Sequence, residues 1–96
     1  MKRLLENFKK QLLDPRVSDE RASNLSGFIT SGYECGCDNR WRMERYYREI
    51  IYKVEMFRAM LTKDETERLP DGVMRRMDMA YMEAKAYEKE YCVSAS

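Results

Sequence analysis

The chain has 96 residues, of which 44% are hydrophobic and 36% charged, and its formal net charge is +1. A chain of this length holds one domain with a modest core, and this composition excludes a disordered tail. The near-balanced charge argues against a bulk polyanion binder, which usually carries a clear basic excess. The sequence has no histidine, so it lacks the commonest general base, metal ligand and pH switch.

The first helix is predicted over residues 2–13. Its apolar residues recur at spacings of three and four, which places them on one helical face: Leu4, Leu5, Phe8, Leu12 and Leu13. The helix should end at Asp14, because the residue before Pro15 is forced out of the helical conformation.

A second short helix is predicted over residues 19–31. Ser18 is a suitable N-cap, since its hydroxyl can accept a hydrogen bond from the free N–H groups of the first turn. Gly32 is a suitable C-cap, because glycine adopts the left-handed conformation that ends many helices. The apolar face of this helix should bury four residues: Ala22, Leu25, Phe28 and Ile29.

Two long helices, over 38–61 and 73–92, are predicted at the centre of the fold. The first carries an apolar seam at alternating spacings of four and three: Met43, Tyr47, Ile50, Val54, Phe57 and Leu61. The second repeats this spacing: Val73, Met77, Ala80, Ala84, Tyr87 and Tyr91. Seams of equal length joined by a short connection should pair antiparallel, with Leu61 opposite Val73. The chain is therefore predicted to form one all-α domain, 1–96, a small bundle of about four helices built on this long antiparallel hairpin.

The hairpin has further expected features. Thr62 and Glu65 have the spacing of a capping box, which predicts a short helical turn over 63–68. Lys53 and Glu83 flank the seam on the same side, so we expect them to lie side by side. The most buried positions should be in the middle of the seam: Ile50, Val54, Phe57, Met77, Ala80 and Ala84.

Three cysteines could converge where the hairpin brings its two ends together: Cys35, Cys37 and Cys92. Three thiolates could ligate Zn²⁺, which makes a small Cys-ligated metalloprotein one alternative function. The paired C-x₂-C spacing of a structural zinc site is absent, however. We therefore favour three unconnected reduced thiols, and we predict no metal and no cofactor.

Four arginines at the start of the first long helix are interleaved with aromatic residues: Arg40, Arg42, Arg45 and Arg48. Arginine and aromatic side chains together can grip phosphates and stack on bases, so a nucleic-acid-binding regulator is the other alternative. Glu44 and Glu49 lie among these arginines at ion-pair spacing. This alternation favours a solvated, ion-paired helix face over a nucleic-acid site.

The chain contains eight methionines and seven tyrosines, residue types that are common in protein interfaces. Several lie off the seam beside charged residues and form the predicted partner-binding set: Arg45, Arg48, Glu49, Tyr52, Met56, Met79 and Met82. The favoured function is a non-enzymatic, protein-binding helical module, which would act as an inhibitor, adaptor or small regulator. A phage or mobile-element inhibitor of a host defence nuclease fits this size and character, and a homodimer is a second use for the same surface.

Catalytic and targeting motifs are both missing from the sequence. Neither GxGxxG nor GxxxxGK[ST] occurs, and no set of carboxylates is marked out for acid–base chemistry. The N-terminal stretch begins like a signal peptide, but Glu6, Lys9 and Lys10 interrupt its apolar region. No apolar run approaches the ~20 residues of a membrane span. We therefore expect a cytoplasmic protein that is not an enzyme and does not enter a membrane.

Overall fold

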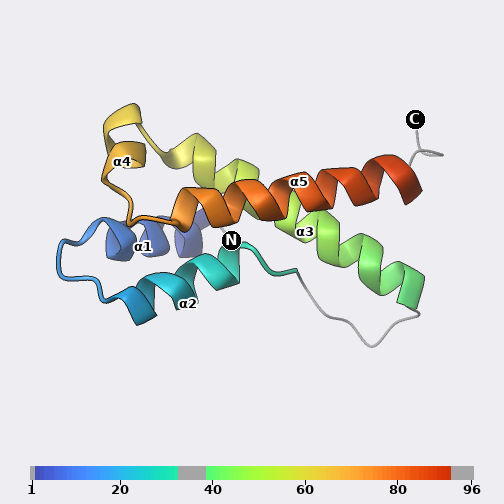
Figure 1. Ribbon diagram of the computed structural model, residues 1–96, viewed down its shortest axis with the longest axis horizontal. Coiled ribbons are helices and arrows are strands. Elements are labelled where there is room, and N and C mark those ends of the chain that lie inside the picture. The colour runs from blue at the N-terminus through green and yellow to red at the C-terminus, as the bar shows by residue number, and fades with distance from the viewer. Residues whose placement is uncertain (1, 33–38, 92–96) are drawn as a thin grey trace.

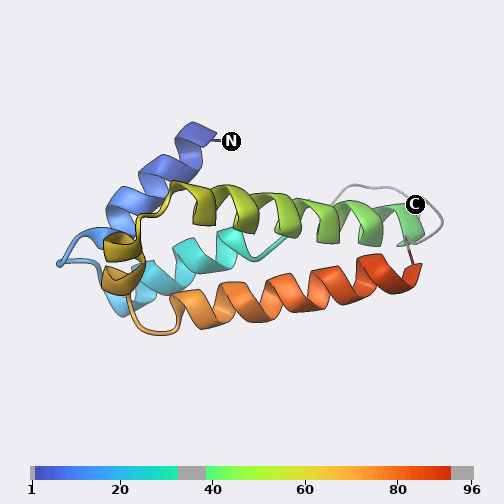
Figure 2. The same cartoon turned by 90° about the horizontal axis from the view of Figure 1, so that it is seen from above.

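The computed structural model describes residues 2–32 and 39–91, of which 39–42 and 91 are described by their backbone alone. This part of the chain forms five helices: α1 (Lys2–Leu13), α2 (Asp19–Ile29), α3 (Asn39–Met60), α4 (Lys63–Arg68) and α5 (Val73–Tyr91). Helices α3 and α5 lie side by side and antiparallel, and α1 and α2 pack against one half of this pair (Figures 1 and 2). The predicted all-α bundle is confirmed, and both hairpin helices match their predicted bounds to within one residue.

The register of the hairpin also agrees with the predicted pairing of the two seams. The Tyr47 ring stacks on the Tyr87 ring with their centroids 4.6 Å apart, and these two residues are opposite each other in the predicted register. Farther along, Arg58 pairs with Asp78. The central seam residues are buried, apart from Ala80, which is half-buried. Met43 is 39% exposed, because α1 and α2 do not reach its end of the hairpin.

Side-chain caps begin α2 and α4 where the sequence predicts them. The Ser18 Oγ accepts a hydrogen bond of 3.0 Å from the backbone N–H of Arg21 at the start of α2. In α4 the Thr62 hydroxyl accepts from the Glu65 N–H at 3.1 Å, and the Glu65 carboxylate accepts from the Thr62 N–H at 3.0 Å. The predicted capping box is therefore confirmed, and each bond satisfies an N–H group that the helix leaves unpaired.

The predicted end of α2 is wrong by two residues. The helix stops at Ile29 and its C-cap is Thr30, whose hydroxyl donates back to the Ser26 carbonyl at 2.8 Å. Gly32 has a different role from the predicted C-cap, since it lies against the backbone of Tyr46 in α3, where a Cβ atom would overlap that backbone. The chain needs glycine there for close approach.

The buried face of α2 also differs from the predicted one at two positions. Ser26 is buried, and its hydroxyl donates to the Ser23 carbonyl at 3.1 Å. Phe28 was expected in the core but remains partly exposed, with its ring edge-on to the ring of Phe8 at 5.0 Å. The phenyl ring lies at the margin of the bundle, where it covers a lysine of α3.

That lysine is Lys53, and its expected pairing with Glu83 is wrong. Lys53 is only 4% exposed, and its Nζ donates to the Phe28 carbonyl at 2.7 Å. The same Nζ lies 4.4 Å from the centre of the Phe28 ring. Glu83 instead accepts a hydrogen bond of 3.1 Å from the Tyr47 hydroxyl. Because α2 covers the Lys53 side of α3, the ammonium group reaches the Phe28 carbonyl in the last turn of α2, which also accepts a hydrogen bond of 3.3 Å from the Ser31 N–H.

Lys9 makes a similar connection at the end of α3. Its Nζ donates to the Met60 carbonyl at 2.9 Å and to the Glu65 carboxylate at 3.1 Å. The hydrogen bond from the Thr62 N–H, together with Lys9, holds the pKa of Glu65 below its ordinary value of 4.5. One side chain of α1 thereby joins the last turn of α3 to the first turn of α4.

Replacing Glu65 with Gln should remove part of the acid sensitivity of the fold. A carboxylate whose pKa is lowered by folding stabilises the protein above its ordinary pKa, and this stabilisation is lost as the pH falls through the lowered value. Urea unfolding of both proteins between neutral pH and about pH 3 should therefore show a difference in stability that shrinks with acidification. A constant difference over this range would contradict the role of the ionised carboxylate.

Candidate protein-binding surfaces

The first candidate surface is the outer face of α3, which points away from α5. Tyr52 lies at its centre and is 49% exposed. Arg48 and Arg45 are one and two turns before Tyr52 and are also exposed, so they share its face. Glu49 and Met56 are half-buried at its margin. We call these residues the α3 surface: Arg45, Arg48, Glu49, Tyr52 and Met56.

A groove between α1 and α3 extends the α3 surface toward the end of α3. Its volume is about 370 Å³, and six residues line it: Lys2, Glu6, Lys9, Lys10, Ala59 and Met60. Ala59 is exposed two turns beyond Tyr52 on the same face of α3. The sequence shows the basic polar side of α1, but only the packing of α1 on α3 places its lysines beside this surface.

The second candidate surface is the outer face of α5, which points away from α3. Met79 and Met82 are 66% and 70% exposed, the largest exposed fractions among the large hydrophobic residues described. The predicted partner-binding residues therefore divide between two sides of the hairpin, and the structure does not join them into one site. Each side has its own apolar centre with charged neighbours.

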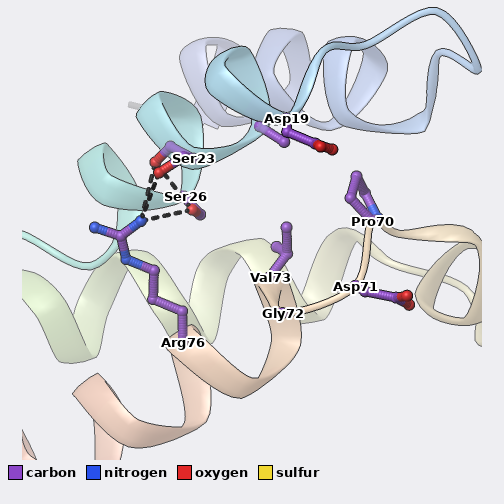
Figure 3. A pocket seen from close by; sticks show the side chains of 9 residues that line it. Asp19, Ser23, Ser26, Pro70, Asp71, Gly72, Val73 and Arg76 are labelled. Atoms are coloured by element: carbon purple, nitrogen blue, oxygen red, sulfur yellow. Dashed lines mark hydrogen bonds between the residues drawn. The ribbon is translucent and has the colours of Figure 1, made fainter.

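A cleft between α2 and the start of α5 was not predicted (Figure 3). It measures about 440 Å³ and is lined by Asp19, Ala22, Ser23, Ser26, Pro70, Asp71, Gly72, Val73 and Arg76. The Arg76 Nη1 donates to the Ser23 carbonyl at 3.1 Å and lies 3.2 and 3.3 Å from the hydroxyls of Ser23 and Ser26. These bonds engage the guanidinium within the chain, so we interpret it as a tie between α2 and α5. Sequence spacing could not reveal contacts between residues 50 or more positions apart.

The residues of the alternative functions are only partly described. Arg45 and Arg48 are exposed on α3, whereas the side chains of Arg40 and Arg42 lie outside the described residues. Cys35, Cys37 and Cys92 lie outside them as well. Within residues 2–32 and 39–91, no group of three or more His, Cys, Asp or Glu residues is placed to hold a metal ion. None of the helices described is long and apolar enough to cross a membrane.

Comparison with protein-family models, curated proteins and solved structures finds no match to this chain. Function must therefore be inferred from the surfaces themselves. Of the two, the α3 surface has the more varied chemistry, because it combines an aromatic centre, two arginines and an adjoining groove.

Proposed function

We propose that the protein is a non-enzymatic, protein-binding helical module that recognises its partner through the α3 surface. The observation that carries this proposal is the half-exposed Tyr52 between exposed arginines and the α1–α3 groove. Tyrosine and arginine are enriched among the residues that dominate binding energy, and a polar rim around an apolar centre is typical of interfaces.

The rigidity of the helix beneath Tyr52 supports the proposal. The opposite face of α3 is anchored by buried core residues, including Ile50 and Val54. A surface that is already ordered before binding loses little conformational entropy when its partner arrives. Tyr52 also has only two side-chain torsions to fix, so it offers a large contact area at low entropic cost.

A protein partner fits this face better than nucleic acid does. Glu6 lies in the groove and Glu49 lies on α3, so acidic groups occur among the basic ones. A phosphate backbone needs a continuous set of cationic contacts, and its binding weakens steeply with salt. Capture of RNA or DNA with that salt dependence, in place of a protein, would favour the nucleic-acid alternative.

We further propose that the module acts by covering a partner's surface, as an inhibitor, adaptor or regulator. Its size and the lack of histidine favour this role over catalysis. An inhibitor of a host defence nuclease, encoded by a phage or mobile element, is one setting consistent with this character. Inhibition of a purified nuclease by the wild-type protein, with loss of inhibition on substitution of Tyr52, would test that setting directly.

A Tyr52→Ala, Arg48→Ala double variant should lose its partner, because it removes both the aromatic centre and the rim of the α3 surface. Residues that dominate an interface contribute about 2 kcal/mol or more each, so recovery should fall at least about tenfold. Affinity purification from native host cells, followed by quantitative mass spectrometry, measures this recovery.

The matched control is a Met82→Ala, Arg75→Ala double variant, which changes an apolar and a basic residue on the other side of the hairpin. It should retain the partner that the α3 variant loses. Both variants should unfold at the wild-type temperature, since all four residues are exposed. If the α3 variant folds normally and retains all partners, the α3 surface is not the binding site.

A further inference from the structure

The outer face of α5 carries a narrow apolar stripe with a charged residue at each end. Met79, Met82 and Ala86 are exposed and follow one another at spacings of three and four, which aligns them along one face. Arg75 precedes this stripe and Glu90 follows it, and both are exposed. We call these residues the α5 surface: Arg75, Met79, Met82, Ala86 and Glu90.

No other described element covers the α5 surface. Helix α5 runs along one long edge of the molecule, with α3 on its inner side (Figure 2). Helix α2 reaches α5 from a different side, through Arg76. Exposed apolar side chains that cluster in this way usually mark a contact with another molecule.

The α5 surface is complementary to an antiparallel copy of itself. Met82 lies close to its midpoint, with Arg75 seven residues before it and Glu90 eight residues after it in the sequence. A two-fold axis between positions 82 and 83 would set Met79 against the second copy's Ala86 and would bring the two Met82 side chains together beside the axis. The same axis would bring Arg75 of each chain to Glu90 of the other, which gives two ion pairs of opposite charge.

Arg75 and Glu90 are available for these pairs, whereas several other charges along α5 are already engaged. Within residues 2–32 and 39–91, neither residue forms an ion pair. By contrast, Asp78 pairs with Arg58, and Lys85 lies 3.7 Å from Glu88. The stripe therefore ends in two charges without partners in the described chain, and they have opposite signs.

We propose that two copies of this chain associate through the α5 surface as an antiparallel pair about a two-fold axis between positions 82 and 83. A parallel pair would set Arg75 against its own copy and would align the two helix dipoles unfavourably. The antiparallel pair is a closed dimer, because the two-fold axis places the same surface of both chains in the contact and leaves none for a third chain. This proposal is independent of the protein-binding role of the α3 surface, which lies on the other side of the hairpin.

The dimer should be weak. One helix face contributes less area than the interfaces of permanently dimeric proteins, and interfaces under about 1,200 Å² are typical of transient association. We therefore expect a dissociation constant in the micromolar range, with dimers present only at high protein concentration. Sedimentation equilibrium over a series of concentrations measures this constant directly.

Charge reversal tests the pairing of Arg75 with Glu90. Arg75→Glu alone and Glu90→Arg alone each replace two attractive contacts by two repulsive ones, so each dimer should weaken by about tenfold or more. A mixture of the two variants should form a heterodimer of wild-type affinity, because both cross-pairs then join opposite charges. If the wild-type protein stays monomeric throughout, or if the mixture associates no better than the single variants, the proposal is overturned.

Cysteine cross-linking tests the position of the axis. In a background with Cys35, Cys37 and Cys92 changed to Ser, Met82→Cys should oxidise to a disulfide-linked dimer, because the two copies of position 82 lie together beside the axis. Tyr52→Cys in the same background is the matched control: it is exposed on the opposite side and should stay monomeric. Equal cross-linking at both positions would show random collision and would contradict a dimer through α5.

The proposed dimer and the proposed partner binding by the α3 surface can be tested separately. The Tyr52→Ala, Arg48→Ala variant should dimerise normally, and the Arg75→Glu variant should still capture a protein partner. Dimerisation that depends on Tyr52 would place the self-association on the α3 surface and overturn the assignment to α5.

Discussion

Replacing Phe57 with Ala is expected to destabilise the protein by about 3–5 kcal/mol. Phe57 is fully buried, and its ring lies in the seam where α3 meets α5. Truncation removes the transfer free energy of the ring and leaves a cavity that surrounding helices fill only in part. Small domains have a total stability of about 5–15 kcal/mol, so this single change should remove a large fraction of it.

Urea unfolding followed by far-UV circular dichroism measures the loss, and thermal unfolding should show a decrease of well over 10 °C, at about 4–8 °C per kcal/mol. Phe57→Leu is the milder variant if the Ala variant does not fold, since it retains most of the buried volume. Tyr52→Ala removes an aromatic ring from the exposed side of the same helix and should change stability by only about 0.5 kcal/mol. Equal stability of the Phe57→Ala and wild-type proteins would mean that the seam is not the core.

The hairpin could be predicted because its signals are local or periodic. The alternation of four and three residues identifies the buried face of each long helix without knowledge of any other element. Ser18 and the Thr62–Glu65 capping box likewise act within a few residues of themselves, and both caps form as predicted. Where the physical cause lies within one helical turn, the sequence was sufficient.

The errors occur where one helix meets another. Gly32 has a local signature of a C-cap, yet its position is determined by the backbone of Tyr46 in α3. Lys53 looks like an exposed residue beside the seam, and it is buried only because α2 packs over it. Helix periodicity gives the direction of a side chain but not which element it will meet.

The candidate site could likewise be predicted where its cause lies within one helix, but not where it depends on packing between helices. The exposure of Tyr52 on the outer face of α3 follows from its position opposite the seam, since Val54 two residues later faces the core. The groove beside it requires the placement of α1, which the amphipathic pattern of α1 does not specify. The seam of the second long helix likewise places Met79 and Met82 on the outer face of α5, away from Tyr52, and both are exposed there.

Replacing Lys53 with Ala is expected to destabilise the protein by about 3 kcal/mol, somewhat less than Phe57→Ala does. The change removes a buried aliphatic stem and leaves the Phe28 carbonyl without the donor that now lies 2.7 Å away. Lys53→Met keeps most of the stem and removes the cost of burying a charge, so it should differ from the wild type by only about 1–2 kcal/mol. Urea unfolding of the three proteins at neutral pH should rank Ala well below the other two, and an Ala variant of wild-type stability would show that Lys53 is not buried.

The difference in stability between the wild-type protein and Lys53→Met should depend on pH in the alkaline range. Burial lowers the pKa of Lys53 below its ordinary value of 10.5, and the nearby Glu49 carboxylate only partly opposes this shift. Between the lowered pKa and 10.5 the unfolded chain binds more protons than the folded one, so the wild type should gain stability relative to the Met variant as the pH rises through this window. Below the window the burial cost is present in full, and above 10.5 the difference should be constant.

Comparing the two proteins cancels the titration of other groups, including Tyr47, whose pKa is raised by burial. A difference that stays constant from neutral pH to 10.5 would mean that the ammonium group is solvated in the folded protein and does not hold the end of α2.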